Sequence, residues 1–251
     1  MSKRTDISAS IVLFNEDVIT LKNTIQSFLE VPFTKKLFLI DNSPSDKLKT
    51  LFKNKEIEYV FVGKNIGFGT AHNIVLDKIN SDYHLILNPD VSFDSDIFNH
   101  LIKQFELNHN LTMISPKVVY PNGKIQYICR ENPTIKEMIS RRTGLFKCYV
   151  NKKQYLYRDL SKPFSPEFIH GCFMLFKTDD FIKLKGFDER YFLYMEDADI
   201  CREIKQTGKE ILYYPEVQIT HIHRKGSAKK MKLLFYHISS ATKYFRKWGF
   251  S

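Results

Sequence analysis

Cysteine and long hydrophobic runs are scarce in this 251-residue sequence. The four cysteines are widely separated and none belongs to a CxxC pair, so neither a disulfide framework nor a structural zinc site is expected. No run of about 18 or more uncharged apolar residues is present, which argues against a membrane-spanning helix. The first residues, Met1 to Arg4, lead directly into an alternating strand pattern without a signal-peptide core. We therefore expect a cytoplasmic protein.

Acidic residues are missing from the C-terminal segment. Residues 222–251 contain eight Lys or Arg and no Asp or Glu, so this segment carries +8 of the net charge of +10 and leaves +2 to the rest of the chain. Apolar residues recur there in steps of three and four, as on one face of a helix: Met231, Leu234, Ile238, Ala241, Phe245 and Trp248. The pattern predicts a basic amphipathic helix within 226–251, packed on the preceding domain or resting, through residues 229–248, on an anionic membrane surface.

The two interpretations of this helix give different partners and locations. A membrane-facing helix would make the protein peripheral on the inner face of the plasma membrane, whereas a packed helix would present a solvated basic face. Aromatic and basic residues also suit nucleic acid, but no recognisable nucleic-acid-binding module accompanies them, so no nucleic-acid partner is expected.

The remaining sequence has a globular composition and a regular alternation of strand-like and helix-like segments. Apolar residues make up 43% and aromatic residues 14% of the chain. The apolar spacing predicts strands at 7–14, 37–40, 57–62, 83–87 and 112–115, and helices at 18–29, 70–79 and 96–107. This order predicts an α/β fold with a mostly parallel sheet flanked by helices.

The second half of the chain is predicted in less detail. Residues 120–124 have the composition of a hairpin turn, and a strand is expected at 168–177 with Gly171 in its interior. A helix is expected from Glu196 to a cap at Gly208. Residues 130–158 are basic and rich in tyrosine, and no element is assigned to them.

Polar residues stand where the predicted strands end. Asn15, Asp41, Asn65 and Asp90 each follow a strand-like run. Ligands of parallel α/β sheets bind beyond the carboxyl ends of the strands, so these side chains are expected to converge on one rim. Asp90 is either a turn or helix-capping residue or a ligand of a Mg²⁺ or Mn²⁺ ion that grips a diphosphate. Asp41 is either the start of an Asx turn or a hydrogen-bond partner of a base or ribose.

Residues 186–202 carry the strongest chemical signal. Four carboxylates stand there among aromatic residues: Asp188, Glu196, Asp197 and Asp199. Neighbouring acids are costly to keep ionised together in apolar surroundings, which indicates proton abstraction or cation binding. The acids at 196, 197 and 199 cannot share one face of a helix. One or two of them can simply favour the helix N-terminus, and at least one is expected to act as a general base on a hydroxyl.

Two further motifs each allow two interpretations. The loop Asn65-Ile66-Gly67-Phe68-Gly69 opens a predicted helix and is either an anion-binding turn or a simple tight turn. His221 and His223 alternate beside the basic segment and are either buried structural histidines or contacts to a metal or a diphosphate.

Taken in order, these motifs resemble the family 2 inverting glycosyltransferases of the GT-A (Rossmann-like) fold, in particular the rhamnosyltransferase-like branch that builds bacterial surface polysaccharides. The matching segments are 11–15, 40–43, 65–69 with Asn73, 87–90, 170–172 and 186–202, followed by His221. The likeness spans about residues 6–250 and thins between 125 and 165. It implies a GT-A domain over 1–225, with a nucleotide-binding half to about 115 and an acceptor and catalytic half from 116.

The resemblance also implies roles for single residues. Asp197 matches the catalytic base of the family's Glu-Asp motif, with Glu196 supporting it. Asp90 matches the last acid of the DxD metal motif, and His221 matches a late histidine that completes the metal or diphosphate site. The implied donor-nucleotide contacts are Phe14, Asn15, Asp41, Asn65, Gly67, Asn73 and Asn88. Asn88 stands where the DxD motif has its first acid, which weakens the implied grip on Mg²⁺ or Mn²⁺.

The implied reaction is a single displacement, in which a deprotonated acceptor hydroxyl attacks the anomeric carbon of a sugar nucleotide and the configuration inverts. The implied donor is a dTDP- or UDP-linked rhamnose or other hexose, and the implied acceptor is a saccharide carried on a lipid. The alternative is a non-catalytic basic protein that binds a membrane or a polymer. This alternative does not explain the presence of Asp41, Asp90 or the acids at 196–199. A nucleotidyltransferase would need a triphosphate-binding Gly/Lys/Arg signature near the N-terminus, and none is found.

Overall fold

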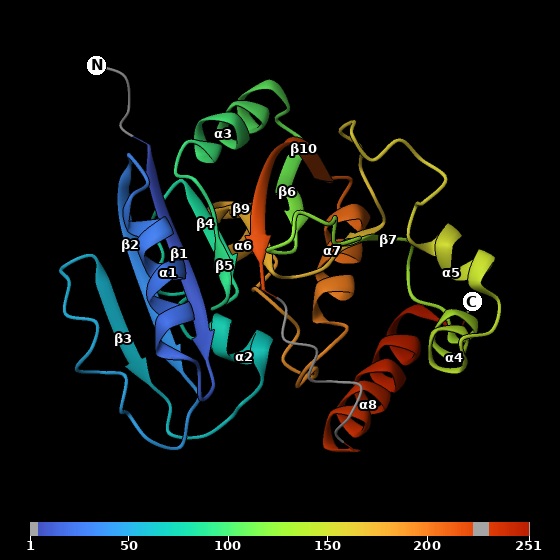
Figure 1. The fold of residues 1–251 in the computed structure, drawn as a ribbon, viewed down its shortest axis with the longest axis horizontal. Helices are drawn as coiled ribbons and strands as arrows, with labels where there is room; N and C mark the ends of the chain where they lie inside the picture. Colours follow the sequence, from blue (N-terminus) through green and yellow to red (C-terminus); the bar gives the residue numbers. More distant parts are fainter. Residues whose placement is uncertain (1–4, 223–230, 251) are drawn as a thin grey trace.

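The computed structural model describes residues 5–222 and 231–250, which form a large sheet covered by helices (Figure 1). The sheet has eight strands in the order β3-β2-β1-β4-β9-β6-β10-β5. They are β1 (Asp6–Leu13), β2 (Thr34–Asp41), β3 (Ile57–Phe61), β4 (Tyr83–Leu87), β5 (Val91–Ser92), β6 (Leu111–Val119), β9 (Phe173–Lys177) and β10 (Glu210–His221). Two short strands, β7 (Cys129–Arg130) and β8 (Phe168–Ile169), pair in a separate ribbon.

The strand directions bring most carboxyl ends to one edge of the sheet. β3, β2, β1 and β4 are parallel neighbours, and β6 and β10 are parallel to each other. β9 runs antiparallel between β4 and β6, so its first residue lies at the edge where those two strands end. β5 pairs antiparallel with β10. The expected mostly parallel sheet is therefore confirmed, with β9 and β5 as antiparallel members.

The central strand β1 is buried on both faces. Ile7 and Ile11 are fully buried on one face. On the other face, Ser10 Oγ lies 2.7 Å from His72 Nδ1 and 2.9 Å from His84 Nε2. Burial lowers the pKa of both histidines, so each is neutral and hydrogen-bonded rather than charged. The bond from Ser10 to His72 ties the helix that carries His72 to the sheet.

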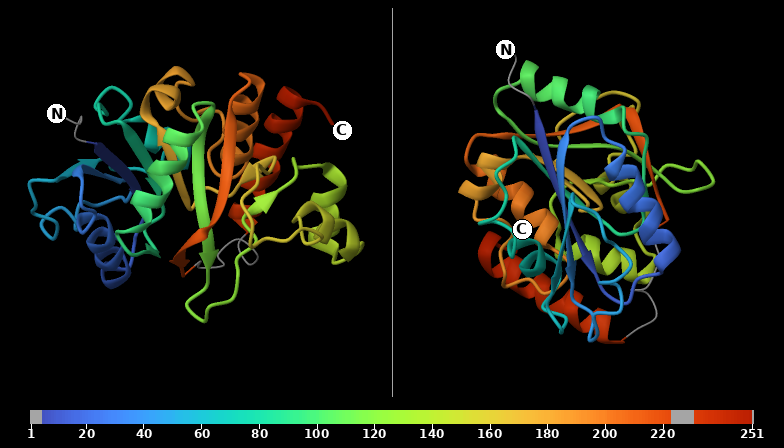
Figure 2. Two further views of the ribbon diagram at one scale, coloured as in Figure 1. Left: turned by 90° about the horizontal axis from the view of Figure 1, so that it is seen from above. Right: turned by 90° about the vertical axis from the view of Figure 1, so that its left-hand side faces the viewer.

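Helices cover both faces of the sheet. They are α1 (Val18–Leu29), α2 (Phe68–Asn73), α3 (Ile97–Leu107), α4 (Ile135–Thr143), α5 (Lys147–Lys153), α6 (Thr178–Lys183), α7 (Glu196–Gln206) and α8 (Met231–Trp248). Figure 2 shows α1 on one face and α6 and α7 on the other. α1 has the predicted bounds: the Asp17 side chain caps it by accepting from the Thr20 N–H at 2.9 Å.

Three segments differ from their predictions. α2 ends at Asn73 instead of 79, because the next residues form tighter i→i+3 turns, beginning with the N–H of Ile74 donating to Ala71 at 3.2 Å. The strand expected at 168–177 is divided into β8 and β9 by a turn at 170–172. The unassigned segment 130–158 contains α4 and α5. The predicted hairpin turn is confirmed by the hydrogen bond from the Tyr120 N–H to the Lys124 carbonyl, 2.8 Å long.

The C-terminal helix α8 packs most closely on the rest of the protein through its second half, while in its first half Tyr236 and His237 contact Phe192 and Tyr194. Ala241, Tyr244 and Phe245 are buried, whereas Met231 and Ile238 are 81% and 54% exposed. The predicted C-terminal helix is present as α8, and its apolar stripe is buried at Ala241 and Phe245 but exposed at Met231 and Ile238. No helix of the described residues combines the length and apolarity needed to cross a bilayer.

Lys247 anchors the packed end of α8 in a group of carboxylates. Its Nζ lies 2.7 Å from Asp199 Oδ2, 2.6 Å from Glu203 Oε1 and 3.2 Å from Asp188 Oδ2. The indole N–H of Trp248 donates to Asp199 Oδ1 at 2.6 Å. Two of the four acids that the sequence groups together, Asp188 and Asp199, are thus partners of a lysine.

Replacing Lys247 by Met is expected to lower the free energy of unfolding by about 2 kcal/mol. Removing one partner of a fully buried ion pair costs about 3–5 kcal/mol, but the Lys247 side chain keeps 19% exposure while Asp199 keeps 1%, so solvent reduces the loss. For a chain of this size this corresponds to a fall in Tm of about 4–8 °C. Arg246→Met, an exposed neighbour on the same helix, is the control in thermal denaturation. Equal Tm values for the two variants would contradict the anchoring role.

Candidate active site

Asp90 and His221 meet at the edge where the parallel strands end. Asp90 follows β4, His221 ends β10, and Asp90 Oδ1 lies 3.2 Å from His221 Nε2. The N–H of Ile222 donates to the Asp90 carbonyl at 3.1 Å, which holds the two segments together. The side chains of Asp90 and His221 are 13% and 7% exposed. The two predicted metal ligands are therefore neighbours, as a shared ion requires.

Gln126 fixes the orientation of the His221 ring. Gln126 Nε2 donates to the His221 carbonyl at 2.6 Å, and Gln126 Oε1 lies 3.0 Å from His221 Nδ1. A carboxamide oxygen only accepts, so Nδ1 carries the proton and Nε2 faces Asp90. Burial alone would lower the pKa of His221, but hydrogen bonds to the Asp90 carboxylate and the Cys172 thiol raise it to about 10. A carboxylate oxygen and an imidazole nitrogen this close suit Mn²⁺ or Mg²⁺, and ion binding would take the place of the Nε2 proton.

Asp197 lies in the first turn of α7 and is held by a chain of hydrogen bonds. Its Oδ2 is 3.1 Å from His170 Nδ1 and accepts from the Gly171 N–H at 3.3 Å. Arg130 Nε donates to His170 Nε2 at 3.3 Å, so Nδ1 is the ring nitrogen whose proton is donated to Asp197. Burial opposes ionisation of Asp197, but the hydrogen bonds from His170 and from the N–H groups of Ala198 and Gly171 outweigh it and lower its pKa.

Glu196 has the opposite protonation preference. It is 6% exposed, and its Oε2 has no hydrogen-bond partner among the described residues. Burial, and next the neighbouring Asp197, raise the pKa of Glu196 to about 8. At pH 7 Glu196 is therefore mostly neutral while Asp197 is ionised, and the pair carries a single negative charge. Environments that separate the pKa values of two adjacent carboxyl groups are typical of acid–base sites.

The turn at 170–172, just before β9, contacts both the pair Glu196–Asp197 and the pair Asp90–His221. Its first two residues hydrogen-bond to Asp197, and the Cys172 carbonyl accepts from the N–H of Asn88 at 3.0 Å. The Cys172 thiol is the hydrogen-bond partner of His221. Because β9 is antiparallel to its neighbours, its start lies beside the ends of β4 and β6. One short turn thus touches both the carboxylate pair and the predicted metal ligands.

A third group of predicted site residues lies beyond the carboxyl ends of β1 and β2. The N–H of Asn15 donates to Ser43 Oγ at 2.9 Å, and Asp41 Oδ1 accepts from the Ser43 N–H at 2.8 Å, which is the Asx turn that one interpretation expected. Asp41 is fully buried, and its Oδ2 accepts a hydrogen bond from the Tyr59 hydroxyl. Phe14, by contrast, is 46% exposed. Asp41 therefore organises this loop, and its contact with a base or ribose stays a prediction, as do those of Phe14 and Asn15.

The glycine loop and α2 hold the segment that leads into α7. Gly67 has φ +99°, and a Cβ there would lie 2.5 Å from the Phe192 carbonyl oxygen. The Gly67 N–H donates to Asn65 Oδ1 at 3.0 Å, which closes the tight turn. The Asn73 carboxamide donates to the Phe187 carbonyl at 2.7 Å and accepts from the Phe187 N–H at 2.9 Å. These residues thus position the segment that leads into α7, and their contact with a donor nucleotide stays a prediction.

Replacing Gly67 by Ala is expected to lower the free energy of unfolding by about 2 kcal/mol, because the positive φ and the clash with the Phe192 backbone both act against a side chain. Gly123→Ala is the matched control: its φ is +78°, but a Cβ there meets no atom within 4 Å, so only the backbone term of about 1 kcal/mol applies. Chemical denaturation measures both. Equal losses in the two variants would show that the contact with Phe192 is unimportant.

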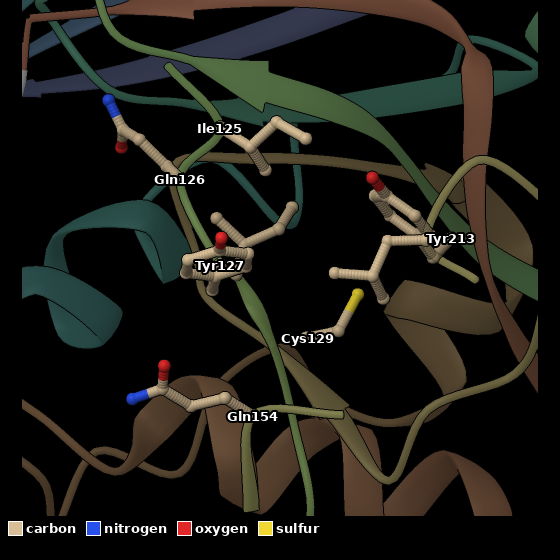
Figure 3. Close-up of a pocket in the computed structure, with 8 residues that line it drawn as sticks. Ile125, Gln126, Tyr127, Cys129, Gln154 and Tyr213 are labelled. Carbon is tan, nitrogen blue, oxygen red and sulfur yellow. The ribbon is translucent and has the colours of Figure 1, made fainter. Parts of the chain in front are cut away.

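Two other features of the described residues have no room for a metal ion or a sugar. Asp188, Asp199 and Glu203 are close enough to share a metal ion, but the Lys247 ammonium group already lies among them. A cavity lined by residues 125–129, Gln154, Leu160 and Tyr213 (Figure 3) has a volume of about 10 Å³. That volume suits a single water molecule, so the cavity is too small for a sugar.

Sequence reasoning assigned no role to three residues of the site, Gln126, Arg130 and His170, although His170 lies in the matching segment 170–172. Gln126 and Arg130 lie in or beside the stretch without an assigned element, and no sequence signal identifies their partners. For His170 a signal existed, because a glycine inside a strand pattern often marks a break, and Gly171 is at the turn. His223, the second predicted histidine, lies outside the described residues.

The fold has counterparts among solved structures. The chain is similar to the structure of GalNAc-T7 with UDP, GalNAc and Mn²⁺, with a TM-score of 0.68 and 18% identity, over 89% of this chain and 44% of that one. It is also similar to the mannosyltransferase PcManGT from Pyrobaculum calidifontis in complex with GDP-Man and Mn²⁺, with a TM-score of 0.66 and 15% identity, over 98% of this chain and 65% of that one. The chain thus spans less than two thirds of either structure. The likeness shows the fold of GT-A glycosyltransferases.

The family follows from the sequence itself. Residues 8–185 match the family described as Glycosyl transferase family 2, and the chain belongs to this family. The protein is therefore a glycosyltransferase, as the resemblance implied, and the family gives no support to the non-catalytic alternative.

Relatives lie in the rhamnosyltransferase-like branch. The chain is 27% identical over 223 residues to Rhamnosyltransferase WbbL of Escherichia coli (strain K12), covering 83% of this chain and 81% of that protein. It is 23% identical over 224 residues to N-acetylglucosaminyl-diphospho-decaprenol L-rhamnosyltransferase of Mycobacterium tuberculosis (strain ATCC 25618 / H37Rv), covering 81% and 72%. These relatives confirm the expected branch of the family.

Proposed function

We propose that this protein is an inverting hexosyltransferase, which moves rhamnose or another hexose from a nucleoside-diphosphate donor to a lipid-linked saccharide in bacterial cell-surface polysaccharide synthesis. The observation that carries the proposal is the turn at 170–172, which touches Asp197 on one side and Asn88 and His221 on the other. A general base and a group of diphosphate-binding residues that are held by the same turn can act on opposite sides of one anomeric carbon.

In the proposed mechanism Asp197 is the general base. Its carboxylate takes the proton of the acceptor hydroxyl while the hydroxyl oxygen forms a bond to the anomeric carbon. The bond from that carbon to the phosphate oxygen breaks, and the nucleoside diphosphate leaves with the electron pair, so the configuration inverts. His170 and the Gly171 N–H hold one oxygen of Asp197, and the Ala198 N–H binds the other at 2.8 Å. Neutral Glu196 keeps the pair from gaining a second charge.

Asp90 and His221 are the proposed ligands of Mg²⁺ or Mn²⁺, and their 3.2 Å separation and the ring orientation set by Gln126 support this. The bound ion would offset the negative charge that develops on the departing diphosphate. Asn88 offers a neutral amide where the family's motif has its first acid, so the protein holds the ion by fewer charges. The similar structures that contain Mn²⁺ support a divalent ion of this kind.

The donor and acceptor are proposed from the site and the relatives. Phe14, Asn15 and Asp41 would receive the base and ribose of a dTDP- or UDP-linked sugar, in a nucleotide-binding half at about 1–115, with Asn65, Gly67, Asn73 and Asn88 as the further donor contacts. The half at 116–225 would receive the acceptor. A relative named for N-acetylglucosaminyl-diphospho-decaprenol supports a lipid-diphosphate acceptor. The segment 226–251, predicted to meet a membrane through residues 229–248, would contact the anionic inner face of the plasma membrane from the cytoplasm with the exposed apolar side chains of the first half of α8, such as Met231 and Phe235.

The test of this function is transfer between defined substrates. The protein is incubated with UDP-, dTDP- and GDP-linked hexoses, Mn²⁺ and a lipid-diphosphate-linked N-acetylglucosamine, and the product is analysed by mass spectrometry and NMR. One donor class is expected to give a disaccharide with inverted anomeric configuration. A product with retained configuration would contradict the single displacement, and the absence of product from every donor would contradict the proposed substrates.

The pH dependence of transfer is expected to change when His170 is replaced. Because the hydrogen bond from His170 lowers the pKa of Asp197, His170→Ala should raise that pKa. Asp197 then becomes protonated at a higher pH, so the acidic limb of the kcat/KM profile moves to higher pH. His170→Asn retains an N–H close to the Nδ1 position and should restore part of the wild-type profile. An acidic limb that stays in place in the Ala variant would exclude this role of His170.

A further inference from the structure

The tip between α4 and α5 exposes two large apolar side chains. Leu145 is 58% and Phe146 is 65% exposed. Phe146 has φ +54°, an unusual backbone conformation for a bulky residue, which carries a local energetic cost. The Phe146 ring has a cation–π contact with Lys136 Nζ, 5.7 Å from the ring centroid, but it stays largely exposed, so burial within the chain offsets little of this cost. Such strain concentrates at positions that serve binding, so the tip is a candidate surface for an external partner.

The surroundings of this tip are strongly basic. Residues 138–158 contain six Lys or Arg and no Asp or Glu: Arg141, Arg142, Lys147, Lys152, Lys153 and Arg158. Arg141 and Arg142 are exposed in the last turn of α4, and Lys147 is exposed in the first turn of α5. Cationic side chains thus stand on both sides of the apolar pair. This combination is typical of surfaces that meet anionic lipid.

The tip belongs to the same end of the molecule as α8. Figure 1 shows α4 beside α8, on the opposite side of the molecule from β3. Burial, and after it the charges of Arg141 and Arg142, lower the pKa of His237 on α8, which places the two helices within electrostatic range of each other. The first half of α8 exposes its own apolar residues, among them Phe235 at 68%. The two helices together therefore present exposed apolar groups among basic side chains, and the one acid of α4, Glu137, is buried and paired with Arg141.

We propose that Leu145 and Phe146 insert into the headgroup and acyl-chain boundary of an anionic bilayer, as a second membrane contact beside α8. The inference rests on the proposed function, because a lipid-linked acceptor requires the enzyme to work at a membrane surface. The charge of the region is complementary to anionic headgroups. A soluble polyanion would be attracted by the same charges, but it has no apolar phase for Leu145 and Phe146. The bilayer is therefore the partner that uses both features.

The test is partition of the full-length protein onto vesicles of phosphatidylglycerol and phosphatidylcholine, measured by co-sedimentation. Leu145→Ser with Phe146→Ser is expected to lower the partition coefficient about tenfold or more, since each buried apolar side chain contributes strongly to transfer from water. Leu107→Ser is the matched control, because Leu107 is 70% exposed at the end of α3. It should leave partition unchanged. Arg141→Gln with Arg142→Gln should weaken binding to the anionic vesicles and flatten its dependence on salt.

The inference is overturned if the tip variant partitions like wild type, if the Leu107 control shows an equal loss, or if the wild-type protein does not partition. A loss confined to Phe235→Ser would assign membrane contact to α8 alone and would also overturn it. Transfer to a short-chain, water-soluble acceptor should be unchanged in the tip variant. This measurement separates the inference from the proposed function, since failed transfer with intact vesicle binding would contradict only the latter. Thermal denaturation verifies that each variant is folded.

Discussion

Asp197→Asn is expected to lower kcat by about 10²–10⁴-fold and to leave nucleotide affinity unchanged. General base catalysis contributes an effect of this size, and an amide cannot take the proton of the acceptor hydroxyl. The substitution keeps the shape of the side chain, so the hydrogen bonds from His170 and Gly171 can still form to its oxygen. Steady-state transfer rates and calorimetric binding of the nucleotide measure the two quantities separately.

Glu196→Gln is the matched control for Asp197→Asn. Glu196 is mostly neutral at pH 7 because burial and Asp197 raise its pKa to about 8, and Gln has nearly the same shape as a neutral Glu. Glu196→Gln should therefore change kcat far less than Asp197→Asn. If the two variants show the reverse order, Glu196 is the base and the assignment is wrong. Near-normal turnover in both would remove the Glu-Asp pair from the mechanism.

Asp90→Asn is expected to weaken Mn²⁺-dependent binding of the nucleoside diphosphate by about 100-fold. The carboxylate would be the charged ligand of the proposed ion, which would offset the negative charge of the diphosphate. Calorimetry with UDP, dTDP and GDP, each with and without Mn²⁺, measures the effect and identifies the nucleotide class. In wild type, Mn²⁺ should strengthen binding of one nucleotide; in the variant, the two conditions should give similar affinities.

Two further variants test the proposed metal site at Asp90 and His221. Gln126→Ala removes the hydrogen bond that orients His221 and is expected to weaken Mn²⁺ binding by about 10–100-fold, the usual effect of losing such a partner. Asp96→Asn is the control, because Asp96 is 75% exposed at the start of α3. Wild-type nucleotide affinity that does not respond to Mn²⁺ would contradict the proposed ion and leave His221 and Asp90 as direct contacts to the diphosphate.

Elements with local causes were predictable. The bounds of α1 and β4 match their predictions, because helix capping by Asp17 and the apolar run at 83–87 act within a few residues. The ends of the strands were predictable for the same reason, and with them the positions of Asp41 and Asp90. The split of the strand at 168–177 was not, because the turn at 170–172 depends on Asp197 and Asn88, which lie elsewhere in the chain.

The separate roles of the four acids at 188–199 could not be predicted from the sequence. In the chain they form one group, and their spacing alone does not separate their tasks. In the structure Lys247, 48 residues beyond Asp199, binds Asp199 and Asp188, whereas His170, 27 residues before Asp197, binds Asp197. Glu196 receives no such partner among the described residues and is left neutral.

The sequence by itself determined the α/β architecture, the family and the identity of the chemical groups, because periodicity, turn residues and ordered motifs are local properties. Only the tertiary structure decided how these groups are used. Asp90 and His221 come together because β4 and β10 end at the same edge, and the antiparallel β9 starts there and brings His170 to Asp197. Protonation follows from these contacts, since burial and hydrogen bonds across long stretches of chain set the pKa values of Glu196 and Asp197 in opposite directions.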